Sequence, residues 1–455
     1  MAISRRALMG TLGASVLGAG ALSGCGEGGV RRGRRGRRPT TTAPTAKPLE
    51  EPEQALMLGS IGATHGRTAP FEKAIATAIA EAMIDVNARY DGLFGQKVQM
   101  MPRHVMADPG EDITEAVNAL ADEGVTTVIS SLDEAALQAA LPVFVERGIA
   151  VIDVITSGTS VREEVDSAGM LVRLCPNDRV TAGSLAEQAL SGGTSDRAGK
   201  RGTVVYLSED TEQGKSLEAA LTEVLQPANG GIVHTHFYAP GDMGDIAPIV
   251  EAVVSNHPAL LVINGGPEAG PFLSALYTAT LDEGNRPTLE IPAWLSPAAT
   301  VDYSSAELAP EAMTRATGWE PGGAVTTDHE LMMINVDPGF LTTGYAYSQQ
   351  GYDAVVLACL AAQSALSVAG SDIAASVPKV LVGDAECTDF GLCRNHLRNA
   401  VANNQRATIS YQGRMGAVEI GSRGDAGKGT LRTYSWNEAG ALTAPGTSTF
   451  EEASG

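Results

Sequence analysis

Short apolar runs alternate with amphipathic stretches along most of this chain, and this alternation constrains the fold more than any other feature. Apolar runs of strand length stand at residues 55–61, 97–101, 125–129, 149–154, 203–207, 233–237 and 260–264. Stretches with apolar residues at helical spacing stand at 71–89, 114–123, 134–146, 215–225 and 246–255. Strands that are apolar throughout need cover on both faces. The pattern therefore predicts doubly wound, parallel α/β sheets.

The alternation falls into two blocks that meet near residues 173–178. Some 400 residues remain after the N-terminal segments, which is too many for one hydrophobic core. We therefore predict two similar lobes. In such sheets, ligands bind beyond the carboxyl ends of the strands.

Polar residues follow several of the predicted strands and are the candidate ligand-binding positions. Each has an alternative structural role. Asp133 could cap the following helix, Thr156 and Ser157 could cap a turn, and Glu209 could stand at a solvated helix start. His65 could lie in a surface turn, and Trp294 could be a core residue or the wall of a ligand cleft. The full candidate set is His65, Ser131, Asp133, Thr156, Ser157, Glu209, Glu268 and Trp294.

The first 25 residues predict export. Arg5-Arg6 form a twin-arginine motif, and residues 10–22 are a small apolar segment, too short to span a bilayer. Leu22-Ser23-Gly24-Cys25 resembles the lipobox of bacterial lipoproteins, in which the cysteine is lipidated. The alternative is an ordinary signal peptide that happens to contain a cysteine.

Residues 26–54 have almost nothing apolar to bury and predict a disordered tether. The arginine run from Arg31 to Arg38 favours contact with anionic lipid headgroups. A nucleic-acid role fits less well, because no aromatic residue is interleaved with the arginines. From residue 53 onward, 23 Lys and Arg stand against 50 Asp and Glu, a net charge of −27, which also excludes a nucleic-acid partner.

Five cysteines are present. Cys387 and Cys393 are six residues apart, and in an oxidising compartment they predict a local disulfide. A metal site is the alternative, but His396 is the only further ligand nearby. Cys175 and Cys359 stand in apolar contexts and predict buried thiols.

We find no hydrolase elbow, phosphate loop or metalloprotease motif in the sequence. The chain is therefore not expected to be an enzyme and needs no cofactor. The alternative is a hydrolase that uses Asp133 and Glu209.

Three motifs carry a resemblance to a known family. Residues 173–178 (RLCPND) with Gly183, residues 351–354 (GYDA), and residues 411–416 (YQGRMG) followed by Gly424-Asp425 occur in the order typical of it. From about Leu56 to Asn437, the chain resembles the leucine/isoleucine/valine-binding branch of the type I periplasmic binding proteins.

The resemblance implies two lobes joined by three crossovers, near Pro176, Trp294 and Tyr411. Lobe 1 would comprise residues 55–175 and 298–408, and lobe 2 residues 176–297 and 409–455. In that family, a serine after the third strand and a threonine after the fourth bind the carboxylate of an amino acid. Here, acidic residues follow Ser131, and no acidic residue stands beside Trp294. These departures favour a cationic or uncharged solute.

The function implied is a lipid-anchored, extracytoplasmic solute-binding protein in the bacterial cell envelope. It would bind an amino acid or a related small polar solute between the lobes and deliver it to the permease of an ABC transporter. The alternative is an envelope sensor or docking lipoprotein that keeps the fold but has a degenerate pocket.

Overall fold

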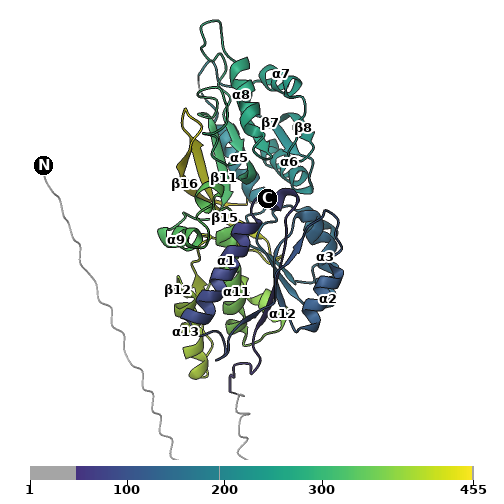
Figure 1. Cartoon of the computed structure of the whole chain (residues 1–455), viewed down its shortest axis with the longest axis vertical. Helices are drawn as coiled ribbons and strands as arrows, with labels where there is room; N and C mark the ends of the chain where they lie inside the picture. The colour runs from purple at the N-terminus through teal and green to yellow at the C-terminus, as the bar shows by residue number, and fades with distance from the viewer. Residues whose placement is uncertain (1–47, 194, 453–455) are drawn as a thin grey trace, which may run out of the picture. The chain divides into compact units, whose positions relative to one another are not determined.

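The computed structural model describes residues 48–193 and 195–452, which form two lobes, each built on one sheet (Figure 1). The predicted signal peptide, Cys25, the run from Arg31 to Arg38 and most of the predicted tether lie outside the described residues. Both sheets contain parallel strands separated by helices, so the predicted doubly wound α/β class is confirmed.

The sheet of the first lobe has the strand order β2-β1-β4-β5-β6, with β3 also paired to β1, and every pairing in it is parallel. Its strands are β1 (Met57–Ala63), β2 (Gln99–Met100), β3 (His104–Met106), β4 (Thr127–Ser131), β5 (Ala150–Asp153) and β6 (Leu171–Arg173). The sequence did not predict β3, which is only three residues long. The predicted strand at 97–101 is shortened to β2.

Helices cover both faces of this sheet because successive strand residues point to opposite sides. Val128 and Val151 enter a core shared with α2 and α3, whereas their neighbours Ile129 and Ile152 enter a core shared with α1 and α11. Figure 1 shows the two helix pairs on opposite sides of the sheet. The helices of this lobe are α1 (Glu72–Ile84), α2 (Thr114–Asp122), α3 (Glu134–Glu146), α4 (Ser160–Glu164), α9 (Thr327–Val336), α10 (Phe340–Thr343), α11 (Ser348–Ala365), α12 (Gly370–Ser376) and α13 (Phe390–Ala402).

The second sheet has the order β14-β15-β11-β10-β9-β7-β8, with β16 paired to β15. Its strands from β7 to β11 pair in parallel, and an antiparallel unit of β14 to β16 is added at one side. The strands are β7 (Lys200–Glu209), β8 (Gly231–Tyr238), β9 (Pro258–Asn264), β10 (Ala293–Leu295), β11 (Ala316–Pro321), β14 (Glu419–Ile420), β15 (Ala426–Trp436) and β16 (Leu442–Glu451). Two helix pairs cover it, α5 (Asp178–Ser191) with α6 (Glu212–Leu225), and α7 (Ile246–Asn256) with α8 (Ala269–Ala279).

The chain passes between the lobes three times, at residues 174–177, 322–326 and 412–418. The second passage corrects the predicted one near Trp294. Strand β11 continues the second sheet beside β10, so residues 298–321 stay with that lobe. The first lobe also extends to Tyr411, because β13 (Ile409–Tyr411) pairs with β12 (Ala385–Cys387) and buries Ile409 in the first core.

The cysteines behave as their spacing and context predict. Cys387 and Cys393 form a disulfide, and Cys175 and Cys359 are free and buried. Among the described residues, no single helix is long and apolar enough to cross a membrane. The segments Ser348–Ala365 and Gly370–Leu381 reach that length and apolar character only when they are taken together, and the chain bends sharply between them.

Candidate functional site

Loops that follow the strands of both sheets meet at one space between the lobes. A small cavity there is lined from both sides, by Arg67, Phe71 and Tyr347 of the first lobe and by Glu209, Thr211, Gln213, Asn264, Gly265 and Ser296 of the second. Most of these residues follow the ends of β1, β7, β9 and β10, and Tyr347 directly precedes α11. This is the place where a doubly wound sheet binds ligands, and here the two sheets share it.

A buried ion pair between Arg67 and Glu134 stands at this space. Arg67 lies in the short turn Gly66–Thr68, and Glu134 is the first residue of α3. Nη1 of Arg67 donates to both carboxylate oxygens of Glu134, at 2.9 and 3.1 Å. The side chains are 13% and 3% exposed. Oε1 of Glu134 also accepts from the backbone N–H groups of Ser157, at 3.1 Å, and Gly158, at 3.4 Å.

The ion pair leaves no free charge at this point. Burial by itself lowers the pKa of the Arg67 guanidinium, but the interactions with Glu134, Tyr347 and Asp178 together outweigh the loss of hydration, and the net shift is upward. Arg67 is therefore protonated at any physiological pH, and its charge is balanced by a carboxylate of the same chain.

Little room remains around the pair. The cavity shared by Arg67, Glu209 and Asn264 has a volume of about 20 Å³. Another, which Arg67 shares with Ser157 and Trp319, has about 10 Å³. One water molecule occupies roughly 10–15 Å³ on this measure, so these spaces hold a water or two and no organic solute.

A much larger cavity, of about 740 Å³, opens beside them, again between the lobes. Its first-lobe lining comes from the turn after β1, the segment 109–114 and the start of α3, and its second-lobe lining from residues 210–212 and Pro240. The lining is rich in carboxylates, which are Glu111, Asp112, Asp133, Glu134, Asp210 and Glu212. Arg67 is the one Lys or Arg in this lining, and Lys215 pairs with Asp210 and Glu212 from outside it.

Four of the predicted site residues line these cavities. His65 and Asp133 line the large cavity, Glu209 lines the 20 Å³ cavity, and Ser157 lines the 10 Å³ cavity. Asp133 also caps α3, because its Oδ1 accepts from the backbone N–H of Ala136 at 2.8 Å. The Nε2 atom of His65 is buried without a hydrogen-bond partner.

Ser131 and Thr156 lie at strand ends as predicted, but their hydroxyl groups form hydrogen bonds with other side chains of the protein. Ser131 Oγ donates to Glu72 at 2.9 Å and accepts from Arg103 at 2.5 Å. Thr156 Oγ1 donates to Asp153 at 2.7 Å. Both residues are fully buried and line none of the cavities described above. Neither hydroxyl is therefore free for a solute in this structure.

Asp153, the partner of Thr156, makes the stability of the protein depend on pH. Burial outweighs its hydrogen bonds from Thr156 and raises the pKa of this carboxyl to about 6. Because this pKa is above that of the unfolded chain, the contribution of Asp153 is complete below pH 4 and is lost as pH rises through 6. Relative to Asp153→Asn, the wild type should lose roughly 2 kcal/mol of unfolding free energy between pH 4 and 7. Urea denaturation across this range measures the difference, and a pH-independent difference would contradict the expectation.

Glu268 follows β9 as predicted, and Trp294 takes the core position that was one of its two predicted roles. Glu268 accepts hydrogen bonds from Tyr238 Oη at 2.9 Å and from the N–H of Gly266 at 2.7 Å, and it lines none of the three cavities described above. Trp294 is 7% exposed and packs in the core beneath α5 and α6. Its neighbours Ala293 and Leu295 face the opposite core, so strand alternation turns the indole away from the cleft.

Of the two residues that form the buried ion pair, Arg67 was not predicted, and Glu134 was noted only as one of the acidic residues after Ser131. Arg67 follows Gly66 without any motif. Glu134 resembles an ordinary acidic residue in the first turn of a helix, where carboxylates are common. The sequence signal for this pair was that residues of opposite charge, Arg67 and Glu134, closely follow the ends of β1 and β4. Within residues 48–193 and 195–452, no group of three or more His, Cys, Asp or Glu side chains could hold a metal ion.

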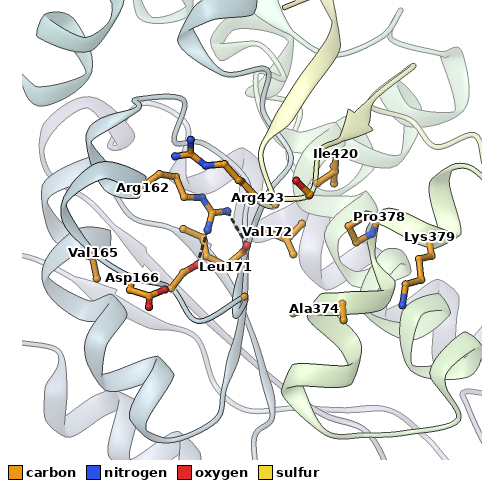
Figure 2. A pocket seen from close by; sticks show the side chains of 16 residues that line it. Arg162, Val165, Asp166, Leu171, Val172, Ala374, Pro378, Lys379, Ile420 and Arg423 are labelled. Carbon is orange, nitrogen blue, oxygen red and sulfur yellow. Dashed lines mark hydrogen bonds between the residues drawn. The ribbon is translucent and has the colours of Figure 1, made fainter.

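A further cavity, of about 600 Å³, lies at the edge of the first sheet beside β6 (Figure 2). On one wall of this cavity, Arg162 donates to Ser167 Oγ at 2.7 Å and to the carbonyl oxygen of Leu171 at 2.8 Å. Nε of Arg162 also donates to Asp425 at 2.9 Å, and Nε of Arg173 donates to the same carboxylate oxygen at 2.7 Å. These contacts fasten the segment before β15 to the first lobe, so we assign Arg162 a structural role.

The sequence and the fold of this chain are both similar to those of known proteins. A sequence model described as "Periplasmic binding protein" matches residues 56–382. Comparison with curated proteins gives no match. Many solved structures are similar. A leucine-binding protein from Thermotoga maritima aligns with a TM-score of 0.60 and 15% identity, over 86% of this chain and 98% of that one.

Two further structures carry ligands. A branched-chain amino acid binding protein from Streptococcus pneumoniae, in complex with isoleucine, aligns with a TM-score of 0.58 and 14% identity over 87% of this chain and 100% of that one. A solute-binding protein from Rhodopseudomonas palustris BisB5, in complex with 3,4-dihydroxybenzoic acid, aligns with a TM-score of 0.60 and 15% identity over 88% of this chain and 98% of that one. At these identities, the likeness shows the fold.

Proposed function

Because this chain belongs to the periplasmic binding protein family, we propose that it is the solute-binding component of an ABC-type uptake system, anchored outside the cytoplasm by lipid on Cys25. The two-lobed fold supports this role, since hinge closure of such lobes around a solute is a common way to present it to a permease. Cys25 stands in the lipobox-like sequence LSGC, which supports the anchor.

We further propose that the solute is a small cation, such as an alkyl amine or diamine. The observation that carries this is the 740 Å³ cavity between the lobes, with six carboxylates in its lining against two cations that pair with them, Arg67 and Lys215. Its size is within the usual range for small-molecule sites. A carboxylate-rich, partly enclosed cavity attracts cations and repels free carboxylic acids.

The proposal predicts that Asp133→Asn weakens binding of the cation roughly ten- to hundred-fold, because a hydrogen bond to a charged group is worth about 1.5–3 kcal/mol. Thermal-shift screening with alkyl diamines and the matching dicarboxylic acids finds the solute, and calorimetry then measures its affinity. Asparagine also caps helices well, so the free energy of unfolding should change by less than about 1 kcal/mol.

Asp245→Asn is a matched control for this measurement. Asp245 caps α7 through the N–H of Ala247 and is absent from the lining of the cavity, so its substitution should leave the affinity unchanged. Equal affinity in Asp133→Asn and wild type would rule out this cavity as the binding site.

A role as an envelope sensor or docking lipoprotein is the second candidate. It is favoured by the innermost spaces at Arg67, which at about 20 and 10 Å³ leave no room for an organic solute. Under this alternative, no diamine, amino acid or aromatic acid would stabilise the protein. A real ligand at a hundred times its Kd adds about 2.7 kcal/mol and would be seen readily.

A further inference from the structure

The Glu134 carboxylate fills a set of anion-binding donors. Two are N–H groups of the loop after β5, from Ser157 and Gly158, and the third is the guanidinium of Arg67. Backbone N–H groups and an arginine that converge on one oxygen pair are what a protein uses to bind a free carboxylate. Here the carboxylate comes from the chain itself.

The surroundings are shaped to this side chain. Glu134 is 3% exposed, although it begins a helix and its predecessor Asp133 is only partly buried. Gly158 lies so close that an added Cβ would be 3.0 Å from Cγ of Glu134. A residue other than glycine at 158 would require the Glu134 side chain to shift by a few tenths of an ångström. The loop after β5 is therefore complementary to the Glu134 side chain in both shape and hydrogen bonding.

We infer that Glu134 is a built-in occupant of an anion site between the lobes, and that it sets specificity by excluding solutes that bear a carboxylate. This inference rests on the proposed function and adds to it: free carboxylic acids are excluded from the solutes that can bind at the donors of Arg67, Ser157 and Gly158. A tethered group competes at high effective concentration, so a free carboxylate at millimolar levels does not displace it.

Deleting the carboxylate tests the inference directly. Glu134→Ala removes four heavy atoms, Cγ, Cδ and two oxygens, and acetate consists of the same four. The variant should unfold at a lower temperature than wild type, and sodium acetate should raise that temperature along a saturating curve. For so small a ligand, half-saturation is expected on the order of 10 mM. Sodium chloride at equal ionic strength should have no such effect.

Glu134→Gln is the matched control. Glutamine fills the same volume without the charge, so acetate should raise its unfolding temperature no more than it raises that of wild type. An equal acetate response in Glu134→Ala, Glu134→Gln and wild type would overturn the inference.

If Glu134→Ala does not fold in the absence of acetate, the yield of folded protein on dilution from urea into acetate or chloride tests the same inference. A higher yield in acetate than in chloride supports the inference, and equal yields overturn it. Neither readout involves the cationic solute. A wild-type protein that binds no amine would therefore count against the proposed function while leaving the acetate result standing.

Discussion

Asp425→Asn is expected to lower the free energy of unfolding by about 3–5 kcal/mol, the usual cost of removing one partner from a buried ion pair. Arg162 and Arg173 both donate to the same oxygen of Asp425, and their side chains are only 6% and 2% exposed. Asparagine keeps an acceptor but cannot neutralise two buried guanidinium groups. Denaturation in urea measures the loss.

Asp122→Asn is the control, since Asp122 pairs with Arg147 at the surface, where its side chain is 73% exposed. That change should cost less than about 1 kcal/mol. A similar loss in the two variants would show that the buried network contributes no more than a surface pair.

The contribution of Asp425 should also disappear in acid. Burial by itself raises the pKa of this carboxyl, but attraction to Arg173 and Arg162 outweighs burial and lowers it. Since the folded pKa is below that of the unfolded chain, the stabilisation is complete above about pH 4 and is lost as pH falls through the folded value. The difference between wild type and Asp425→Asn should therefore shrink in acid.

Cys25→Ser should move nearly all of the protein from the membrane to the soluble fraction. Two acyl chains hold a protein stably at about 0.8 kcal/mol per buried CH₂, whereas the run from Arg31 to Arg38 binds only through charge. At 1 M salt, the Debye length is about 3 Å, so charge alone would not hold the variant. Membrane fractionation with a 1 M salt wash measures the distribution.

Cys359→Ala is the matched control for this experiment. Cys359 is a buried free thiol in α11, so its substitution should leave membrane attachment unchanged. Retention of Cys25→Ser on membranes in high salt would refute the lipid anchor.

Elements with a strong local pattern were predictable from the sequence. Helix α3 has the predicted bounds 134–146, and the apolar runs at 125–129, 149–154 and 260–264 became β4, β5 and β9. Strand β11 was not predicted, because its sequence ATGWEP contains glycine, proline and a charged residue, all poor strand formers. Glu320 is tolerated there because it pairs with Arg432, 112 residues away. The misplaced second crossing follows from that one missed strand.

The site was predictable to the level of strand ends and no further. Chain direction places His65, Asp133, Ser157 and Glu209 near the cleft, and all four line cavities there. Whether a hydroxyl at a strand end is free depends on partners that are remote in sequence. Ser131 is bound by Glu72, 59 residues away, a contact that no local pattern encodes.

The three passages between the lobes have a consequence for biosynthesis. The last strand of the first sheet ends at Arg173, yet α11, which covers one face of that sheet with α1, ends only at Ala365. At 5–20 residues per second, a ribosome needs roughly 10–40 s to make the chain between them. During that time, the first sheet has no complete cover, and its apolar face is open to water or to a chaperone. Nascent chains that stop before α11 should therefore aggregate, whereas full-length chains close both lobes.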